Sequence, residues 1–221
     1  MKTAVLACNT IRDELLLAER RVTSGHEIFW LESNLHNYPA KLHAEMQKEL
    51  DRLDGYDRVL MAFGFCGNSV ADLESRSFEL ILPRIDDCIS LMIGSISKRA
   101  KLSEGHQSIY VTEGWIRHES NIWKEYEYTI KKYGEKRAQF VINAMYGKYD
   151  MLSIIDTGAY QVDSIIDEAK RIADKFGLDQ NVIPGTTSLL ELLLTGPWDK
   201  DQFVTIPPHD SINTNDLQLF W

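Results

Sequence analysis

The residues of this chain best suited to chemistry are its three cysteines and one of its histidines. Cys8, Cys66 and Cys88 each come soon after a short apolar run, and His36 follows a fourth such run. Runs of this kind are typical of strands buried in a parallel sheet, whose carboxyl ends lie at the edge where open α/β proteins bind ligands. Three thiolates and one imidazole are a recognised tetrahedral zinc set. The spacing therefore predicts a metal site formed by these four residues, with zinc as the first choice.

Two other interpretations of the same residues stay open. Three thiolates also suit an iron–sulfur cluster. The third interpretation is packing, because no two cysteines have the close C-x-x-C spacing and a free cysteine is most often a small buried hydrophobe. What favours a shared site is that every cysteine follows a strand and none lies inside a predicted helix.

The loop around Cys66 has the composition of a ligand-binding turn. Gly64 and Gly67 flank the cysteine and allow close backbone approach, and Gly67-Asn68-Ser69 is expected to open a helix whose amides face an anion. A thiol beside such a helix N-terminus ionises more readily. We therefore assign Gly64, Gly67 and Asn68 to cofactor binding.

A guanidinium and an acid pair, Arg84, Asp86 and Asp87, precede Cys88 and are assigned to catalysis. One acid is expected to cap the following helix, since adjacent residues cannot both take the cap position. The other is expected to face the pocket, where it would orient a metal-bound imidazole. The alternative is that Asp86 or Asp87 only stabilises the start of the helix and takes no part in chemistry.

Two later strand-to-helix turns supply further candidates. Thr112 is assigned to cofactor binding, and Asp156, in Asp156-Thr157-Gly158, to catalysis. Turn formation alone explains both about as well. The chain has no Walker loop, no G-x-G-x-x-G, no G-x-S-x-G and no H-E-x-x-H, so nucleotide-dependent and serine-hydrolase functions lose their main support.

Charge and composition exclude several classes of protein. The chain carries 24 Lys and Arg against 33 Asp and Glu, a net charge of −9, which argues against a nucleic-acid surface. No apolar stretch is long enough for a membrane span, and the first residues are too short a run for a signal peptide. Three cysteines make a disulfide framework unlikely to form, so we expect a cytoplasmic protein with a small-molecule or protein partner. A homo-oligomer stays open.

The elements that must position these residues alternate between strand and helix. Eight apolar runs predict strands: Thr3–Ala7, Glu27–Leu31, Arg58–Phe63, Glu79–Leu82, Ser108–Thr112, Met151–Ile155, Asn181–Ile183 and Gln202–Ile206. Helical periodicity lies between them, with Thr10 and Asp13 as a capping box before Glu14–Arg21 and with Pro39 opening the next helix. Alternation of this kind predicts an α/β fold, Rossmann-like, with a mainly parallel sheet or sheets and flanking helices, in one lobe or two packed lobes.

The domain organisation is predicted from the aromatic segment in the middle of the chain. Residues 1–114 form a first α/β lobe with five strands, residues 115–148 a helical aromatic bridge, and residues 149–221 a smaller second lobe with three strands and a C-terminal tail. Aromatic residues of the bridge are expected to pack between lobes. We expect the second lobe to close over the site. The alternative is one continuous eight-strand sheet.

Four blocks of the sequence resemble a bacterial and archaeal family called domain of unknown function 1638. They are Phe63-Gly64-Phe65-Cys66-Gly67-Asn68, Leu82-Pro83-Arg84-Ile85-Asp86-Asp87-Cys88-Ile89 with Gly94-Ser95, Tyr110-Val111-Thr112-Glu113-Gly114-Trp115, and Asp156-Thr157-Gly158-Ala159-Tyr160. The resemblance runs from Cys8 to about Pro207. Members are often encoded near corrinoid-dependent methyltransferases, which implies a link to one-carbon metabolism.

Together the residues and the resemblance lead to one hypothesis and three rivals. The hypothesis is a metal-dependent enzyme in which thiolate-bound zinc supports methyl transfer linked to a corrinoid protein, with His36 as fourth ligand or general base. The first rival places an iron–sulfur cluster on the three cysteines. The second is a carrier that binds a corrinoid or a metal without chemistry, and the third is an accessory protein whose cysteines only pack.

Overall fold

The computed structural model describes residues 1–117, 122–213 and 215–217, and it divides the strands between two sheets. The first sheet has the order β2-β1-β3-β4-β8. Its strands are β1 (Thr3–Cys8), β2 (Glu27–Leu31), β3 (Arg58–Ala62), β4 (Glu79–Pro83) and β8 (Phe203–Ile206). All its pairings are parallel except that of β8 with β4. The second sheet is parallel, with order β5-β6-β7, from β5 (Ser108–Val111), β6 (Met151–Asp156) and β7 (Asp179–Pro184).

The predicted fold class is confirmed, and all eight predicted strands form at or near the expected residues. Their distribution between the sheets differs from the prediction in two places. β5, which was expected in the first lobe, pairs with β6, and β8, which was expected in the second, returns to pair with β4. The prediction grouped strands by chain order, whereas an antiparallel edge strand can arrive from any later part of the chain.

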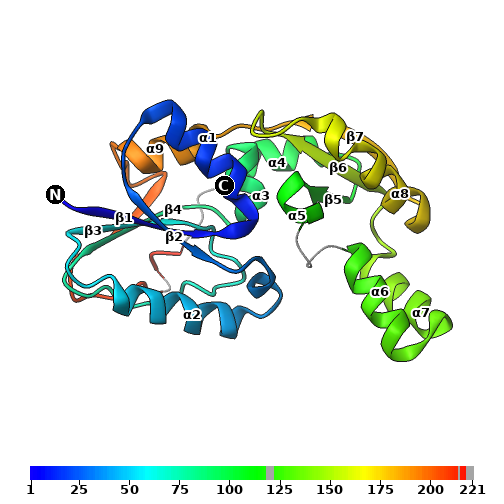
Figure 1. The fold of residues 1–221 in the computed structure, drawn as a ribbon, viewed down its shortest axis with the longest axis horizontal. Helices are drawn as coiled ribbons and strands as arrows, with labels where there is room; N and C mark the ends of the chain where they lie inside the picture. Colours follow the sequence, from blue (N-terminus) through cyan, green and yellow to red (C-terminus); the bar gives the residue numbers. More distant parts are fainter. Residues whose placement is uncertain (118–121, 214, 218–221) are drawn as a thin grey trace.

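Helices cover both faces of the first sheet (Figure 1). α2 (Pro39–Arg52) lies on one face, and α1 (Arg12–Val22) and α9 (Ser188–Thr195) lie on the other. Pro39 is the first residue of α2, as predicted, and α9 ends at Gly196. The predicted capping box of α1 is wrong, because its N-cap is Ile11 and no side chain caps it.

The remaining helices lie around the second sheet or between the two sheets. They are α3 (Cys88–Ile93), α4 (Ile96–Leu102), α5 (Glu113–Arg117), α6 (Ile122–Tyr133), α7 (Glu135–Tyr146) and α8 (Ile166–Phe176). The predicted aromatic bridge thus contains α5, α6 and α7, rather than two helices, and residues 118–121 within it lie outside the described residues. α6 and α7 form a hairpin that projects from the rest of the molecule (Figure 1).

Two hydrophobic clusters hold the sheets together. One lies under α2 on a single face of the first sheet and includes Leu42, Met46 and Leu50. The other runs continuously from the opposite face of the first sheet, through α1 and α9, into the second sheet, joining Val5 and Leu60 to residues such as Ile154 in one cluster. A shared core of this kind makes the two sheets one packed unit.

The carboxyl ends of the two sheets meet at a close backbone contact. A Cβ atom built on Gly114, in α5, would lie 1.9 Å from the carbonyl oxygen of Thr10. Thr157, just after β6, donates a hydrogen bond to Glu14 of α1 at 3.1 Å. The turn after β5 therefore packs against the turn after β1, and the turn after β6 packs against α1.

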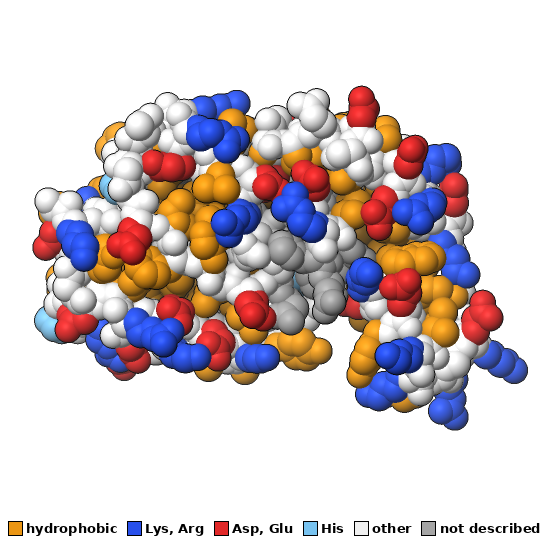
Figure 2. Space-filling model, viewed as in Figure 1, with side chains coloured by type: hydrophobic (Ala, Val, Ile, Leu, Met, Phe, Trp, Pro, Cys, Tyr) orange, Lys and Arg blue, Asp and Glu red, His pale blue; other side chains and the backbone are white. Residues whose placement is uncertain are grey.

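The surface carries charges of both signs. On the face shown in Figure 2, acidic and basic side chains are interspersed, and Lys and Arg do not gather into one patch. Within the described part of the chain, none of the helices has the length and apolarity needed to cross a membrane.

Candidate functional site

The loops after β2, β3 and β4 and parts of the second sheet line an open cavity of about 380 Å³, which we call the thiol cavity. It is lined by His36, Cys66, Gly67, Asp87, Cys88, Ile89, Arg99, Ser108, Ile109, Tyr110, Trp115, Tyr146 and Tyr149. The first five come from strand-end loops of the first sheet or from the start of α3. The others come from α3, α4, β5, α5 and the region of α7 and the turn after it. A volume of this size suits a small organic molecule.

Two thiols stand side by side in the cavity wall. The hydrogen bond that Cys88 shares with Cys66, and then burial, raise the pKa of the Cys88 thiol well above its usual value. Cys88 therefore keeps its proton and acts as the donor of the pair. Cys66 is therefore the acceptor of the pair, beside a thiol that stays protonated.

Cys8 lies near this pair but does not line the cavity. Burial raises the pKa of its thiol, and its Sγ lies 3.3 Å from the hydroxyl oxygen of Thr10. Repulsion from Cys66 also raises the pKa of Cys8, and repulsion from Cys8 raises that of Cys88. The three sulfurs are thus close enough to interact electrostatically, as expected from their positions at neighbouring strand ends.

The three thiols do not form a metal site as they stand. Tetrahedral zinc requires each sulfur at about 2.3 Å from one point. Among the described residues, no group of three or more His, Cys, Asp and Glu side chains is placed to hold a metal ion. Thiolate and imidazole are suitable zinc ligands, but the side chains are not placed to bind one zinc ion together.

The backbone of the Cys66 loop explains where its sulfur lies. The amides of Phe65 and Cys66 donate to the carbonyl oxygens of Ile85 and Asp86 at 2.9 and 2.8 Å, which ties this loop to the loop after β4. Gly64 is required by this approach, since a Cβ there would lie 2.5 Å from the Cα of Asp87.

After Cys66 the chain turns through the left-handed region. Cys66, Gly67 and Asn68 have φ of 45°, 67° and 65°. The expected helix after Gly67 is absent, because successive left-handed residues cannot continue a right-handed helix. A non-glycine residue with positive φ is uncommon and stores strain, and such residues cluster at active sites.

Asp87 both caps α3 and lines the cavity, two roles that were expected to be divided between Asp86 and Asp87. Its carboxylate caps α3 by accepting from the amides of Ile89 and Ser90 at 2.9 and 3.1 Å, and it also lines the cavity. Asp86 does not line the cavity. Arg99 of α4 bonds to both acids, at 2.7 Å to Asp87 and 3.3 Å to Asp86, so the prediction that the second acid faces the pocket is wrong.

His36 reaches the cavity from the 3₁₀ turn Ser33–Asn37 after β2. Burial lowers the pKa of its imidazole, although a hydrogen bond with the backbone of Ser33 and the charge of Glu125 oppose this. His36 is therefore favoured in its neutral form, which can accept a proton.

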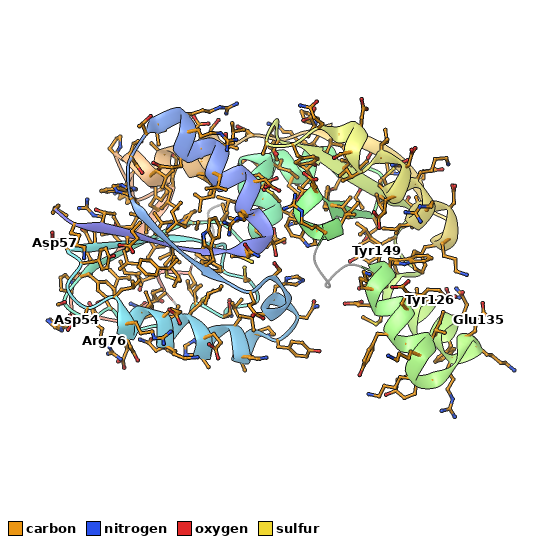
Figure 3. All side chains as sticks on the ribbon, viewed as in Figure 1. Asp54, Asp57, Arg76, Tyr126, Glu135 and Tyr149 are labelled. Carbon is orange, nitrogen blue, oxygen red and sulfur yellow. The ribbon has the colours of Figure 1, made fainter. Side chains whose placement is uncertain are left out.

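Aromatic rings form the wall opposite the thiols. The guanidinium of Arg99 lies 5.3 Å from the ring centroid of Tyr110. The rings of Tyr146 and Tyr149 have centroids 5.9 Å apart, and the Tyr146 hydroxyl donates to Glu125 at 2.6 Å. Tyr149 lies where the α6–α7 hairpin meets the second sheet (Figure 3).

The other predicted site residues lie outside this lining. Arg84 donates to the carbonyl oxygens of Lys200 and Asp216 and so anchors the C-terminal segment. Asp156 is exposed and accepts from the amide of Gly158. Thr112 is fully buried, and its hydroxyl has no partner among the described residues. Gly64 and Asn68 belong to the Cys66 loop without lining the cavity.

Sequence reasoning missed Arg99 and most of the aromatic wall. The acid pair could have predicted a residue such as Arg99, because two adjacent carboxylates are stabilised by a nearby cation. Tyr146 was expected only to pack in the bridge. Nothing in the local sequence of Tyr110 or Trp115 distinguishes a ring that lines a cavity from one that fills a core.

Comparison with known proteins adds one result. The model of the family described as protein of unknown function (DUF1638) matches residues 30–194. The match covers most of the chain, which therefore belongs to this family, as the resemblance predicted. Neither a curated protein nor a solved structure gives a match.

Proposed function

We propose that this chain is an enzyme that acts on a small molecule in the thiol cavity, with Cys66 as its nucleophile. The observation that supports this is the pairing of Cys66 with a protonated Cys88 in the wall of a cavity of about 380 Å³. A thiolate is a strong nucleophile and needs only an environment that favours its ionised form.

The strained position of Cys66 supports the same role. With φ at 45°, the residue is held at a sharp turn shortly after β3, where the chain emerges from the carboxyl edge of the first sheet. Strain at such a turn is commonly retained where it presents a reactive side chain to a ligand.

The reaction class that fits these groups is acyl transfer or acyl hydrolysis. The Cys66 thiolate would add to the carbonyl carbon, an S–C bond would form, and the bond to the leaving group would break. Cys88 would supply the proton that the leaving group takes. Water or a second nucleophile, with neutral His36 as base, would then cleave the thioester and restore the thiolate.

Zinc-supported methyl transfer is a second candidate, and the specific observation in its favour is Cys8. The first candidate uses Cys66 as nucleophile and Cys88 as proton donor, and it gives Cys8 no role. Three thiolates together, by contrast, are a set of metal ligands. Bound zinc would supply Lewis-acid activation of a thiol. A corrin ring with its side chains is larger than the thiol cavity, so a corrinoid would have to be presented by a partner protein.

Both candidates need reduced thiols. All three cysteines are free in the structure, and the proposal therefore places the protein in the cytoplasm, where thiols are kept reduced.

The test uses an activated ester, p-nitrophenyl acetate, with the reduced full-length protein. We expect a release burst and a protein mass increased by one acetyl group, mapped to Cys66 by peptide analysis. Cys66→Ser should lose the adduct, and Cys8→Ser should keep it. No adduct, or an adduct on Cys8 or Cys88, would contradict the nucleophile assignment.

Metal analysis of anaerobically purified protein decides between the candidates. About one zinc per chain, lost in Cys8→Ser, would favour the second candidate over the first. Iron with inorganic sulfide would favour a cluster instead. Protein free of metal that still forms the acetyl adduct would support the thiol nucleophile.

A further inference from the structure

We infer that Cys66 and Cys88 also carry out thiol–disulfide exchange with a small organic disulfide, with Cys66 as the attacking thiol and Cys88 as the resolving thiol. This second activity rests on the nucleophile of the proposed function but takes a different electrophile. Its basis is the second thiol in the cavity wall, because acyl transfer requires one nucleophilic sulfur and disulfide exchange requires two.

Both thiols are reduced, adjacent and open to the same space. Cys66 and Cys88 are free cysteines, their side chains share a hydrogen bond, and both line the thiol cavity. A disulfide that reaches the sulfur of Cys66 therefore lies beside the sulfur of Cys88. Cys8 is also free but does not line the cavity, so a ligand there does not meet it first.

The backbone fixes the two cysteine loops side by side. The amide of Cys66 donates to the carbonyl oxygen of Asp86 at 2.8 Å, two residues before Cys88. Gly64 lies directly against Asp87, where an added Cβ atom would be 2.5 Å from the Cα atom of the acid. Sulfurs held in hydrogen-bond contact by such loops need only small side-chain rotations to reach the bonding distance of a disulfide, about 2.05 Å.

The exchange balances with the substrate as its only oxidant. The thiolate form of Cys66 attacks one substrate sulfur, an S–S bond to Cys66 forms, and the substrate S–S bond breaks to release one thiol. Cys88 then gives its proton to water and attacks the sulfur of Cys66, which releases the second thiol. Two protons leave the cysteines and two are taken up by the released thiols. A small thiol returns the pair to its reduced form by the reverse exchange.

The cavity favours a substrate of low molecular weight. Its volume is about 380 Å³, and beside the thiols its lining includes the apolar side chains of Ile89 and Ile109 and the ring of Tyr149. A space of this size and character holds a small organic molecule. The substrate class is therefore a disulfide with short organic substituents.

The test uses bis(2-hydroxyethyl) disulfide with the reduced full-length protein, under anaerobic conditions so that oxygen does not compete. We expect two mercaptoethanol molecules to be released per chain, and we expect a disulfide between the peptides that contain Cys66 and Cys88. A mixed disulfide that remains on Cys66, a disulfide that includes Cys8, or no reaction at all would overturn the inference.

Variants assign the two steps. Cys88→Ser should stop the reaction halfway, with one mercaptoethanol released per chain and the other retained as a mixed disulfide on Cys66. Cys8→Ser is the matched control, because it removes a neighbouring thiol outside the cavity lining, and it should react as the natural protein does. Loss of the exchange in Cys8→Ser, or complete release in Cys88→Ser, would contradict the assignment.

Unfolded protein tests whether the fold contributes. In urea the mixed disulfide on Cys66 should persist at least about tenfold longer than in the folded protein, because only a flexible chain then joins the two cysteines. Equal lifetimes would mean that the exchange is adventitious thiol oxidation. Faster reaction with the disulfides of insulin than with the small disulfide would overturn the substrate class.

The outcomes separate this inference from the proposed function. An acetyl adduct on Cys66 without the disulfide between Cys66 and Cys88 would remove the exchange activity and leave the acyl reaction. That disulfide without an acetyl adduct would remove the acyl reaction and leave the exchange activity.

Discussion

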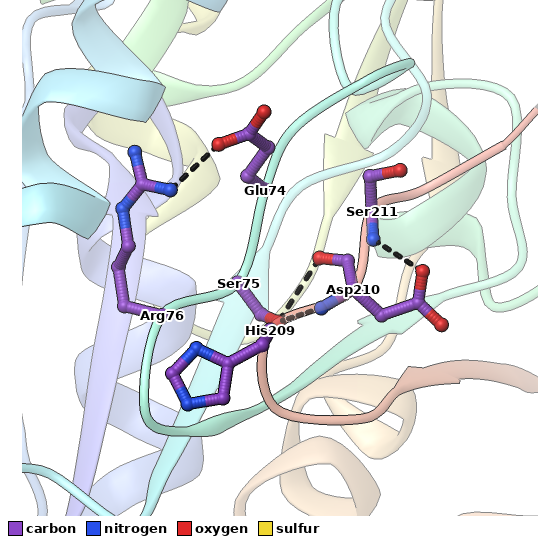
Figure 4. A pocket seen from close by; sticks show the side chains of 6 residues that line it. All are labelled: Glu74, Ser75, Arg76, His209, Asp210 and Ser211. Atoms are coloured by element: carbon purple, nitrogen blue, oxygen red, sulfur yellow. Dashed lines mark hydrogen bonds and ion pairs between the residues drawn. The ribbon is translucent and has the colours of Figure 1, made fainter.

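Two depressions lie at opposite edges of the first sheet. The thiol cavity is at the carboxyl edge, where the second sheet meets it, and a polar hollow of about 300 Å³ is at the amino edge (Figure 4). The hollow is lined by Glu74, Ser75, Arg76, His209, Asp210 and Ser211. Both contain a residue with positive φ, Cys66 in one and His209 in the other. Neither volume nor a positive φ is therefore enough by itself to identify a functional site.

The difference is in how the polar groups are satisfied. In the hollow, the Ser75 hydroxyl donates to the carbonyl oxygens of Pro207 and Asp210, and it accepts from the amide of Asp210. Around the junction of the sheets, by contrast, one carboxylate oxygen of Glu14 and the hydroxyls of Ser33 and Thr112 are buried without a partner among the described residues, although none of the three residues lines the thiol cavity. A buried group of this kind indicates a functional role, stored strain or an ordered water. The two regions therefore differ in how well their buried polar groups are satisfied.

The largest test of this contrast is the pH dependence that Glu14 should cause. Burial raises the pKa of its carboxyl from 4.5 to about 7. Between about pH 4.5 and 7, the Glu14 carboxyl is protonated in the folded state and ionised in the unfolded state. The contribution of Glu14 to the free energy of unfolding is therefore greatest below about pH 4.5 and falls as the pH rises towards 7. The full fall is about 3 kcal/mol. Glu14→Gln should match the natural protein at pH 4 and exceed it at pH 8 in urea unfolding.

Equal stability of the two proteins at pH 8 would show that Glu14 is solvated or paired in solution. Asp13→Asn, on the neighbouring and more exposed residue, keeps Glu14 and is the control, so it should retain the pH dependence of the natural protein.

Two arginines give the next largest test, because each bonds to two carboxylates. Arg99 holds Asp86 and Asp87 with its side chain 26% exposed, and Arg76 holds Asp51 and Glu74 with its side chain 38% exposed. Arg99→Leu should cost about 2 kcal/mol, because it leaves two partly buried carboxylates without their cation. Arg76→Leu should cost less than this, because solvent screens its exposed ion pairs. A larger loss in Arg76→Leu would reverse the contrast between the two regions.

The sequence predicts the strands better than it predicts the cavity, for physical reasons. A buried strand can be predicted from its apolar run, because the run depends only on local residues. The pairing of β4 with β8 depends on a contact between distant segments of the chain, and no local sequence pattern predicts that contact. Gly67-Asn68-Ser69 suits a helix start as well as the left-handed turn that forms, because glycine and asparagine accept both conformations. Tyr110 lines a cavity only because the second sheet lies opposite the thiols.

The acid pair before α3 gives a smaller effect. Asp87→Ala removes the cap of α3 and the shorter bond to Arg99, and we expect a loss of about 1–2 kcal/mol. Asp86→Ala removes one bond to the amide of Asp87 and the longer contact with Arg99, and it should cost less. Thermal unfolding of both variants measures this. Equal losses would mean that the cap contributes little.

The smallest effects should have opposite signs in the two regions. Thr112→Val keeps the side-chain shape and removes a fully buried hydroxyl that has no partner, so it should stabilise the protein by about 1 kcal/mol. Ser75→Ala removes a hydroxyl that bonds to Pro207 and Asp210 and should destabilise it by about 1 kcal/mol. Urea unfolding of the two variants at one pH resolves differences of this size. If Thr112→Val destabilises the protein, the hydroxyl has a partner in solution, such as an ordered water, and the junction is as well satisfied as the hollow.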